Sequence, residues 1–370
     1  MRKLVGLALS IALLAVAPLA FGQGQSAPGA VYTMTNAASG NEVLVYPRAA
    51  QGALGAPTAF ATGGVGTGSG LGNQSGLVLS DDERWLIVVN AGSNTVSVFS
   101  VEQDSLSLAD VADSGGTLPI SVTVDRDLVY VLNAGGRVGG ADNVVGFRLD
   151  PHGQLAMLAG SSRPLSAPST DPAQVGIDPS GRVLVVTEKA TNLVDTFALG
   201  RDGIAVAPVP NTFPSPGATP FGFDFGKRSQ LFVSEAAGGA PSASSASSYR
   251  VHRDGNLQLI SGAVATTQTA ACWLIVTNDG RHAFTANTPD SSISGLRIAP
   301  NGMLTLADAT AGLPDTGPVD MALSNDGRNL YSRNGGGSSI SIFRVRADGK
   351  LTKGHPDVTV PSGANGLAAR

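Results

Sequence analysis

The chain has 370 residues, of which 42% are hydrophobic and only 14% carry a charge. Its 48 glycines and 22 prolines favour a fold with many turns and few helices. The net charge of -4 comes without any block of Lys and Arg, which excludes nucleic acid as an expected partner because phosphate binding needs clustered cations.

The first 22 residues have the features of a secretory signal peptide. Arg2 and Lys3 supply a positive start, an apolar run follows from Leu4 to Ala17, and Ala20 to Gly22 offers small residues where a signal peptidase cleaves. A retained membrane anchor is disfavoured because the run is short for a bilayer span. No cysteine follows the run, so the segment is not a lipoprotein signal. We therefore expect residues 23–370 to form one exported domain, periplasmic or secreted, without membrane contact after cleavage.

The rest of the chain repeats one pattern seven times. A copy has an apolar strand, a tight turn, a second strand that ends in Asn or Glu, and a loop. A third strand with period-two alternation follows, then a Gly-containing turn and a weaker fourth strand. The second strands end at Asn36, Asn90, Asn133, Glu188, Glu235, Asn287 and Asn334. The copies are about 45 to 55 residues apart, which is the spacing of four-stranded propeller blades.

The N-terminal copy lacks a first strand, and we expect the missing strand at the other end of the chain. Residues 365–370, "NGLAAR", resemble "VDMALS", the first strand of the seventh copy. We infer that they complete the first blade and close the ring, which leaves no long open sheet edge. The predicted fold class is therefore all-β, a single seven-bladed β-propeller of four-stranded antiparallel blades.

Other architectures fit the repeat less well. No ten-residue stretch after the N-terminal segment has helical periodicity, which excludes an α/β fold. A β-sandwich would not need seven equivalent units, and two domains would need a linker that interrupts the repeat. Two Gly- and Ser-rich stretches are expected to be mobile loops: Gly63–Gly76 between the first two blades, and Gly238–Ser248 within the fifth.

The loops after the second strands and between the blades surround one end of a propeller's central channel, and we expect a ligand site at this mouth. The candidate ligand-binding residues are Asn90, Asn133, Gln174, Lys189, Phe221, Trp273, Asn287, Arg333 and Asn334. Such amide, cationic and aromatic side chains suit a small polar ligand. The asparagines also have a simpler interpretation, since Asn tolerates left-handed backbone and caps strand–loop junctions.

Glu188 and Glu235 replace Asn at the strand ends of two adjacent blades. Two carboxylates at one mouth are candidates for a general acid and a general base if their pKa values diverge. A structural role at the strand end is the alternative, and the residues alone do not decide between the two.

Other kinds of site are not expected. The four histidines, His152, His252, His282 and His355, fall in or near hairpins of the far face on separate blades, so they cannot converge on a metal or complete a Ser-His-Asp triad. The Gly63–Gly76 stretch lacks Lys and precedes no helix, so it is not a phosphate cradle. Cys272 is the only cysteine and is expected to be a buried, inert thiol. We expect neither a metal nor a cofactor.

Three passages resemble the lactonase-like seven-bladed β-propellers. They are "VLVVTEKATNLVDTF" from Val183, "LFVSEAAGGAPSASSASSYRV" from Leu231 and "ACWLIVTNDGRHAFTAN" from Ala271. This family includes bacterial 6-phosphogluconolactonases and fungal 3-carboxy-cis,cis-muconate lactonizing enzymes. The resemblance covers essentially the whole chain after the N-terminal segment, and it is strongest with exported members whose reaction is unknown.

The resemblance also implies positions for catalytic residues, most of which this chain lacks. Asp171 and Ala173 stand where the family has a His-x-His stretch. Phe221 and Gly222 stand at the Arg and His of a Gly-Pro-Arg-His stretch. Only the family's Glu is retained, as Glu235.

Two hypotheses follow. The first is an exported, monomeric propeller that binds a small polar ligand or a protein partner at the channel mouth. The second is a divergent lactonase or cycloisomerase that acts on a sugar-lactone or muconolactone-like compound with Glu235 and Glu188. Lactone hydrolysis needs a base and an oxyanion donor, and a phosphosugar needs cations, of which only Lys189 and Arg333 lie near the mouth. The missing catalytic residues favour the first hypothesis.

Overall fold

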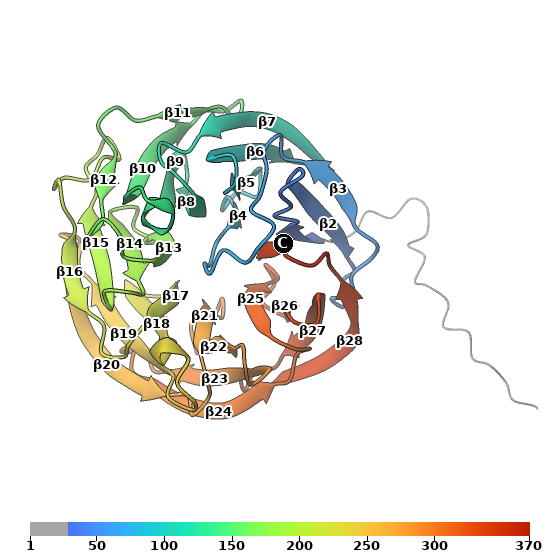
Figure 1. Cartoon of the computed structure of the whole chain (residues 1–370). Helices are drawn as coiled ribbons and strands as arrows, with labels where there is room; N and C mark the ends of the chain where they lie inside the picture. Colours follow the sequence, from blue (N-terminus) through green and yellow to red (C-terminus); the bar gives the residue numbers. More distant parts are fainter. Residues whose placement is uncertain (1–28, 104) are drawn as a thin grey trace, which may run out of the picture.

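The computed structural model describes residues 29–103 and 105–370, so the predicted signal peptide at residues 1–22 lies outside the described residues and stays a prediction. Seven antiparallel β-sheets stand around a central axis like the blades of a propeller (Figure 1). Two short 3₁₀ turns, η1 (Gly135–Val138) and η2 (Ala237–Gly239), are the only helical segments in this part of the chain. The predicted all-β, seven-bladed propeller is confirmed.

Each blade runs from an inner strand at the axis to an outer strand at the rim (Figure 1). Blade 1 consists of β29 (Asn365–Ala369), β1 (Gly29–Met34), β2 (Glu42–Arg48) and β3 (Thr58–Ala61). Blade 2 consists of β4 (Leu77–Leu79), β5 (Trp85–Asn90), β6 (Thr95–Val101) and β7 (Leu106–Asp113). Blade 3 consists of β8 (Pro119–Asp125), β9 (Leu128–Ala134), β10 (Asp142–Leu149), β11 (Leu155–Met157) and β12 (Arg163–Pro164).

The remaining blades follow the same order. Blade 4 consists of β13 (Pro172–Ile177), β14 (Val183–Glu188), β15 (Leu193–Ala198) and β16 (Asn211–Pro214). Blade 5 consists of β17 (Pro220–Gly226), β18 (Gln230–Glu235), β19 (Ser245–Val251) and β20 (Leu257–Ala265). Blade 6 consists of β21 (Ala271–Val276), β22 (His282–Asn287), β23 (Ser292–Ile298) and β24 (Leu304–Gly312). Blade 7 consists of β25 (Pro318–Leu323), β26 (Asn329–Asn334), β27 (Ser339–Val345) and β28 (Leu351–Thr359).

The core lies in the seams between blades. The second strand of each blade is buried at every position because neighbouring blades cover both of its faces. In blades 2, 3 and 4 its sequence is accordingly a nearly continuous apolar run. The outermost strands face solvent on one side and alternate in exposure. In the seam between blades 4 and 5, the ring of Phe223 packs where Gly176 leaves room, since a Cβ at Gly176 would lie 2.7 Å from that ring.

Blade 3 departs from the four-strand pattern at its rim. Its fourth strand is divided into β11 and β12, and both pieces pair with β10. Gly160 lies between them with a φ of 74°, a left-handed conformation that interrupts an extended strand. Pro164 in β12 has no N–H to donate, which suits a rim position.

The ring is closed by the C-terminal strand, as the sequence predicts. β29 pairs antiparallel with β1, with Val31 opposite Ala369 and Met34 opposite Asn365. Thr33 Oγ1 adds a hydrogen bond of 2.7 Å to Gly366 O within this ladder. Blade 1 therefore draws its inner strand from one end of the described chain and its other strands from the opposite end.

Deletion of residues 365–370 tests how much this closure stabilises the fold. Because Leu367 and Ala369 are buried and β1 would lose its inner partner, we expect unfolding free energy to fall by about 3 kcal/mol or more. Urea melts of the truncated and full-length proteins measure this loss. Arg370→Ala, which keeps the strand, is the control, and an unchanged urea midpoint in the truncated protein would contradict the closure.

The second Gly- and Ser-rich stretch is shorter as a loop than predicted. Ser245 begins β19, so only the first part of Gly238–Ser248 lies between strands, and the residues from Ser245 to Ser248 are buried. The high Ser content of this stretch suggested a mobile loop, but Ser245 and Ser247 are buried in blade 5 and bond to Glu235. Prediction of a mobile loop over the whole stretch was therefore wrong.

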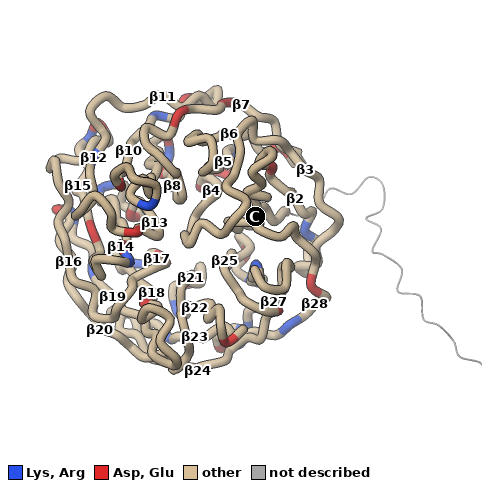
Figure 2. The backbone as a smooth tube through the Cα atoms, viewed as in Figure 1, with Lys and Arg blue, Asp and Glu red and all other residues tan. Residues whose placement is uncertain are grey.

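Charged residues are spread around the ring in Figure 2 without a large patch of one sign. This agrees with the absence of a Lys and Arg block in the sequence. Among the residues that the structure describes, no helix has the length and apolar character needed to cross a membrane.

Candidate functional site

Residues 71–74 belong to the connection from β3 to β4 and lie at the centre of the ring (Figure 1). They are called the plug segment below. Asn73 bonds to three inner strands. Its Nδ2 donates to Ile120 O of β8, and its backbone carbonyl accepts from Trp273 Nε1 of β21 at 2.8 Å. Its Oδ1 accepts from Asn365 Nδ2 of β29 at 3.1 Å. The plug segment therefore occupies the axis of the propeller, where the sequence predicts a central channel.

Gln74 extends this network to β21. Its Nε2 donates to Leu274 O at 2.8 Å, and its Oε1 accepts from Leu274 N at 3.0 Å, so the side chain pairs with the strand as a backbone group would. Gly76 follows where a Cβ would lie 2.7 Å from Asn365 Oδ1. The prediction that Gly63–Gly76 is a mobile loop is thus wrong for its second half, because glycine here permits close packing.

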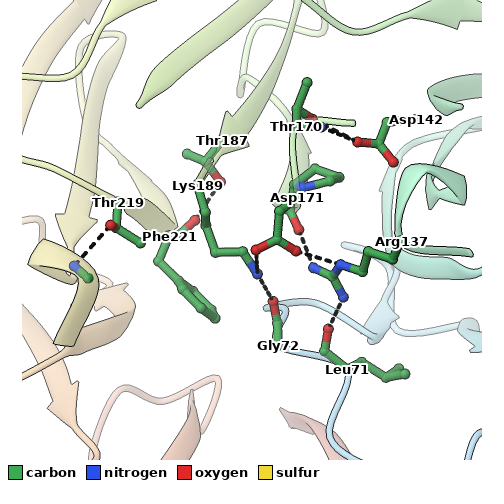
Figure 3. Close-up of polar contacts among 12 residues, drawn as sticks. Leu71, Gly72, Arg137, Asp142, Thr170, Asp171, Thr187, Lys189, Thr219 and Phe221 are labelled. Atoms are coloured by element: carbon green, nitrogen blue, oxygen red, sulfur yellow. Dashed lines mark hydrogen bonds and ion pairs between the residues drawn. The ribbon is translucent and has the colours of Figure 1, made fainter. Parts of the chain in front are cut away.

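A cluster of two cations and one carboxylate lies at the mouth beside the plug segment (Figure 3). Lys189 follows β14, and its Nζ donates to Gly72 O at 2.8 Å and lies 3.4 Å from Asp171 Oδ2. Arg137 of η1 forms an ion pair of 2.6 Å with Asp171 and donates to Leu71 O at 2.5 Å. The Lys189 side chain is 10% exposed, whereas that of Asp171 is 47% exposed. The carboxylate therefore marks the solvent side of the cluster.

Asp142 holds together the two loops that carry Arg137 and Asp171. Its Oδ1 accepts from Gly136 N at 2.8 Å. Its Oδ2 accepts from Thr170 N at 2.6 Å (Figure 3). Each bond joins the carboxylate to the residue that precedes a member of the cluster. The spacing between Arg137 and Asp171 is thus set by a buried carboxylate in β10.

Lys189 has an unusual electrostatic environment. Burial lowers its pKa to about 8, the positive charge of Arg137 acts in the same direction, and Asp171 opposes both. Its Nζ also lies 4.9 Å from the centre of the Phe221 ring, a contact that favours the charged form. Lys189 is mostly charged at pH 7 and loses its proton over the next pH units.

An apolar wall borders this amine. The rings of Phe221 and Trp273 lie 5.0 Å apart, on the inner strands of blades 5 and 6, and both are buried. Cys272 precedes Trp273 and is partly exposed, and burial raises the pKa of its thiol to about 12. A thiol with this pKa is protonated at neutral pH, so it does not act as a nucleophile there.

The strand-end asparagines donate hydrogen bonds to other residues of the protein. The Nδ2 group of Asn90 donates to Thr95 and Ser97 of the third strand, at 3.1 and 2.7 Å. The same pair of bonds joins Asn287 to Ser292 and Ser294, and Asn334 to Ser339 and Ser341. Asn133 differs and donates to Ser114 O at 3.2 Å. All four are fully buried, which supports the structural interpretation over ligand contact.

Glu235 occupies the equivalent position in blade 5. Its carboxylate accepts from Ser215 Oγ at 2.9 Å, Gly217 N at 3.0 Å and Ser247 Oγ at 2.5 Å, and also from Ser245 Oγ. It is fully buried. Both carboxylate oxygens are therefore already bonded within the protein, and neither faces the mouth cluster.

Glu188 is held in the same way in blade 4. It accepts from Ser166 N at 3.0 Å, from Ser166 Oγ, and from Thr191 Oγ1 at 2.5 Å. It is also fully buried. Each predicted catalytic carboxylate is thus enclosed in its own blade, and the structure does not bring Glu188 and Glu235 together as an acid–base pair.

Gln174 and Arg333 lie apart from this cluster. Gln174 of β13 bonds to both backbone groups of Phe223, at 2.7 and 3.0 Å, and so links the inner strands of blades 4 and 5. Arg333 lies in β26 opposite Asp320 and is 6% exposed. Burial lowers the pKa of Arg333 to about 10 and raises that of Asp320 to about 7. Of the predicted ligand residues, the structure brings together Lys189, Phe221 and Trp273.

The N-terminal third of the chain matches a known protein family. A family model described as "Lactonase, 7-bladed beta-propeller" covers residues 29–161. The chain has the seven-bladed β-propeller fold and resembles this family over the matched residues. The periplasmic gluconolactonase of Pseudomonas aeruginosa superposes with a TM-score of 0.72 at 18% identity, over 92% of this chain and 98% of that one.

Two further solved structures have the same fold. A Lactobacillus plantarum protein gives a TM-score of 0.72 at 16% identity, over 92% of this chain and 99% of that one. A functionally unknown protein from Desulfotomaculum acetoxidans gives 0.67 at 15% identity, over 91% and 98%. A search of curated proteins returns no match. Identities this low establish the fold of the lactonase-like propeller and leave its chemistry to its own residues.

Sequence reasoning missed Arg137 and the plug segment. Arg137 is the only charged residue in a Gly-rich loop, "AGGRVGGA", and a lone cation between flexible residues was the available signal. Asp171 was noted at the position of a histidine in the family that the chain resembles, and its ion pairs were not predicted. The described residues contain no group of three or more His, Cys, Asp or Glu side chains suited to a metal ion.

Blade 4 of the lactonase-like propeller carries one further buried carboxyl, Asp195. It stands where blades 2, 6 and 7 have Ser97, Ser294 and Ser341, so the hydroxyl that bonds the strand-end residue elsewhere is here a second acid. Burial and, to a smaller extent, the neighbouring Glu188 together raise the pKa of Asp195 to about 9. Asp195 is therefore the protonated member of a carboxyl–carboxylate pair.

Asp195→Asn tests this pair through the pH dependence of stability. An unfolded Asp ionises near pH 4, whereas folded Asp195 keeps its proton to about pH 9, so wild-type stability is reduced as pH rises through that window. The variant has no carboxyl at this position and does not lose stability in this way. Its unfolding free energy, relative to that of the wild type, should therefore rise by up to about 1.4 kcal/mol for each pH unit. Urea melts between pH 5 and pH 8.5 measure the difference. Surface Asp127→Asn is the control, and parallel curves for Asp195→Asn and wild type would contradict the assignment.

Proposed function

We propose that this lactonase-like propeller binds a small, polar, negatively charged ligand at the mouth of its central channel. The observation that carries the proposal is the cluster of Lys189 and Arg137 around one half-exposed carboxylate, Asp171. Two cations and one anion leave a surplus positive charge beside solvent. A carboxylate or similar anion would compensate that charge and accept hydrogen bonds from both cations.

The surroundings of the cluster suit a small molecule. Phe221 provides an aromatic face next to the Lys189 amine, and the carbonyls of the plug segment limit the depth of the site. Asp171 has a φ of 49°, a conformation uncommon outside glycine and concentrated at sites where the surrounding structure imposes it. Such a rigid, partly exposed group of charges is typical of ligand-binding sites rather than of surface ion pairs.

The burial of Glu188 and Glu235 favours ligand binding over catalysis as the function of the mouth. Lactone hydrolysis needs a base that reaches water and donors for the developing oxyanion. Glu188 and Glu235 are bonded on both oxygens and have no exposed surface. The family's catalytic positions at 171, 173, 221 and 222 carry Asp, Ala, Phe and Gly.

A second candidate function is a divergent lactonase or cycloisomerase for a sugar-lactone or muconolactone-like compound. One observation favours it: the Lys189 amine has a pKa of about 8, close enough to neutrality for it to accept a proton during a reaction. The fold shared with a gluconolactonase is consistent with it. If residues 1–22 export the protein, a cytoplasmic phosphosugar lactone is a poor substrate candidate.

A thermal-shift screen against aldonic acids, muconate-type acids, sugar lactones and divalent metals tests the binding proposal. We expect acids to raise Tm, because ligands that bind only the folded state stabilise it. The effect should fall as pH rises through about 8, because Lys189 then loses the charge that attracts the anion. Lys189→Met should abolish the shift, while exposed Lys350→Met should not. Equal shifts in wild type and Lys189→Met would overturn the proposal, and consumption of a lactone would favour the second function.

Glu235→Gln separates the structural and catalytic roles of this residue. Because the carboxylate accepts several buried hydrogen bonds, we expect the substitution to lower unfolding free energy by about 1–3 kcal/mol and to leave ligand affinity unchanged. Urea melts and titration calorimetry measure the two effects. Loss of lactone turnover with unchanged stability would instead assign Glu235 to catalysis.

A further inference from the structure

A cavity of about 470 Å³ lies at the end of the propeller opposite the mouth. It is lined by the turns between β17 and β18 and between β21 and β22, and by the turns after β23 and β27. These turns follow the first and third strands of a blade, whereas the mouth loops follow the second and fourth strands. Because neighbouring strands of a blade are antiparallel, the two sets of connections lie at opposite ends of the propeller. The cavity is therefore separate from the Lys189 cluster, and its volume is in the usual range for a small-molecule site.

Positive charge dominates the lining. Four cationic side chains, Lys227, Arg228, Arg281 and Arg297, face two carboxylates, Asp279 and Asp348. The local charge of +2 contrasts with -4 for the whole chain. Arg281 lies 3.7 Å from Asp279, and Arg228 donates to Pro300 O at 3.0 Å. Among the described residues, neither Lys227 nor Arg297 has an ion-pair partner.

His282 provides a polar group at the wall of this cavity. The residue is 7% exposed, and its backbone is fixed by three hydrogen bonds with Thr277. Its imidazole lines the cavity and forms no hydrogen bond with any described residue. Gly349 confines the ring, since a Cβ there would lie 2.4 Å from His282 Cδ2. Because no described residue bonds to the ring nitrogens, they are available to a ligand in the cavity.

We propose that this cavity binds a phosphate monoester with an apolar portion. Lys227 and Arg297 bind the phosphate oxygens, since their charges are uncompensated. The local surplus of two positive charges matches a dianionic head group better than a single carboxylate. His282 hydrogen-bonds to the ligand through its imidazole, and Ile298 and Pro300 contact the apolar portion. This site does not depend on the function proposed for the mouth.

The blade repeat offers a matched control. Arg297 is the sixth residue of β23, and Arg344 is the sixth residue of β27 in the next blade. Both side chains are exposed, but only Arg297 lines the cavity. Arg297→Gln and Arg344→Gln therefore remove the same charge from equivalent strand positions. Their unfolding midpoints without ligand verify that both variants fold.

Titration calorimetry of the propeller with phenyl phosphate tests the proposal. We expect one site that Arg297→Gln weakens by about tenfold, as the loss of a charge-assisted hydrogen bond implies. Arg344→Gln and Lys189→Met should bind as wild type does, inorganic phosphate should compete, and benzoate should bind more weakly. Loss of binding in Lys189→Met, equal weakening in both arginine variants, benzoate binding as tight as that of phenyl phosphate, or no heat of binding would each overturn the proposal.

Discussion

The ladder between β29 and β1 is the interaction on which the rest of the structure depends. It supplies blade 1 with its inner strand and covers backbone groups of β1 that would otherwise face the axis unpaired. It also brings Asn365 to the centre of the ring, where its amide bonds to Asn73 of the plug segment. Closure of the ring therefore supplies one of the hydrogen bonds that hold the plug segment at the axis.

The plug segment in turn gives the mouth its chemistry. Arg137 and Lys189 both donate to its backbone carbonyls, at Leu71 and Gly72. Carbonyl groups satisfy buried N–H donors without cancelling their charge. Within residues 29–103 and 105–370, Asp171 is the one carboxylate that forms an ion pair with either cation. The outcome is a pair of fixed cations at the mouth whose charge is only partly compensated. A ring with the same strands but an open axis would lack these acceptors, and the long cationic side chains would turn to solvent.

The sequence predicted the architecture well because the information is periodic. Alternation, turn chemistry and the sevenfold repeat located every second strand and the strand that closes the ring. They also gave the last residue of the second strand in five blades, whereas β1 ends at Met34 instead of Asn36 and β9 at Ala134 instead of Asn133. The predictions of two mobile loops were partly wrong because they used the Gly and Ser content of a segment and not its packing. The glycines before β4 permit close approach to inner strands, and the serines that begin β19 bond to a buried carboxylate; neither use differs in composition from a mobile linker. Asp171 and Lys189 flank the paired residues Pro172 and Glu188 of blade 4, whereas Arg137 reaches them from a loop of blade 3, and no spacing along the chain indicates that contact.

The contacts of the plug segment bear on how the protein comes apart. In a repeat array whose units touch only their neighbours, opening can begin at one unit and spread along the chain. Here four consecutive residues bond to blades 1, 3, 4 and 6, and the first blade is built from both ends of the described chain. Opening of any of these blades therefore breaks bonds to units on the other side of the ring. The plug segment thus couples blades 1, 3, 4 and 6 directly, beyond the contacts that each blade makes with its neighbours in the ring.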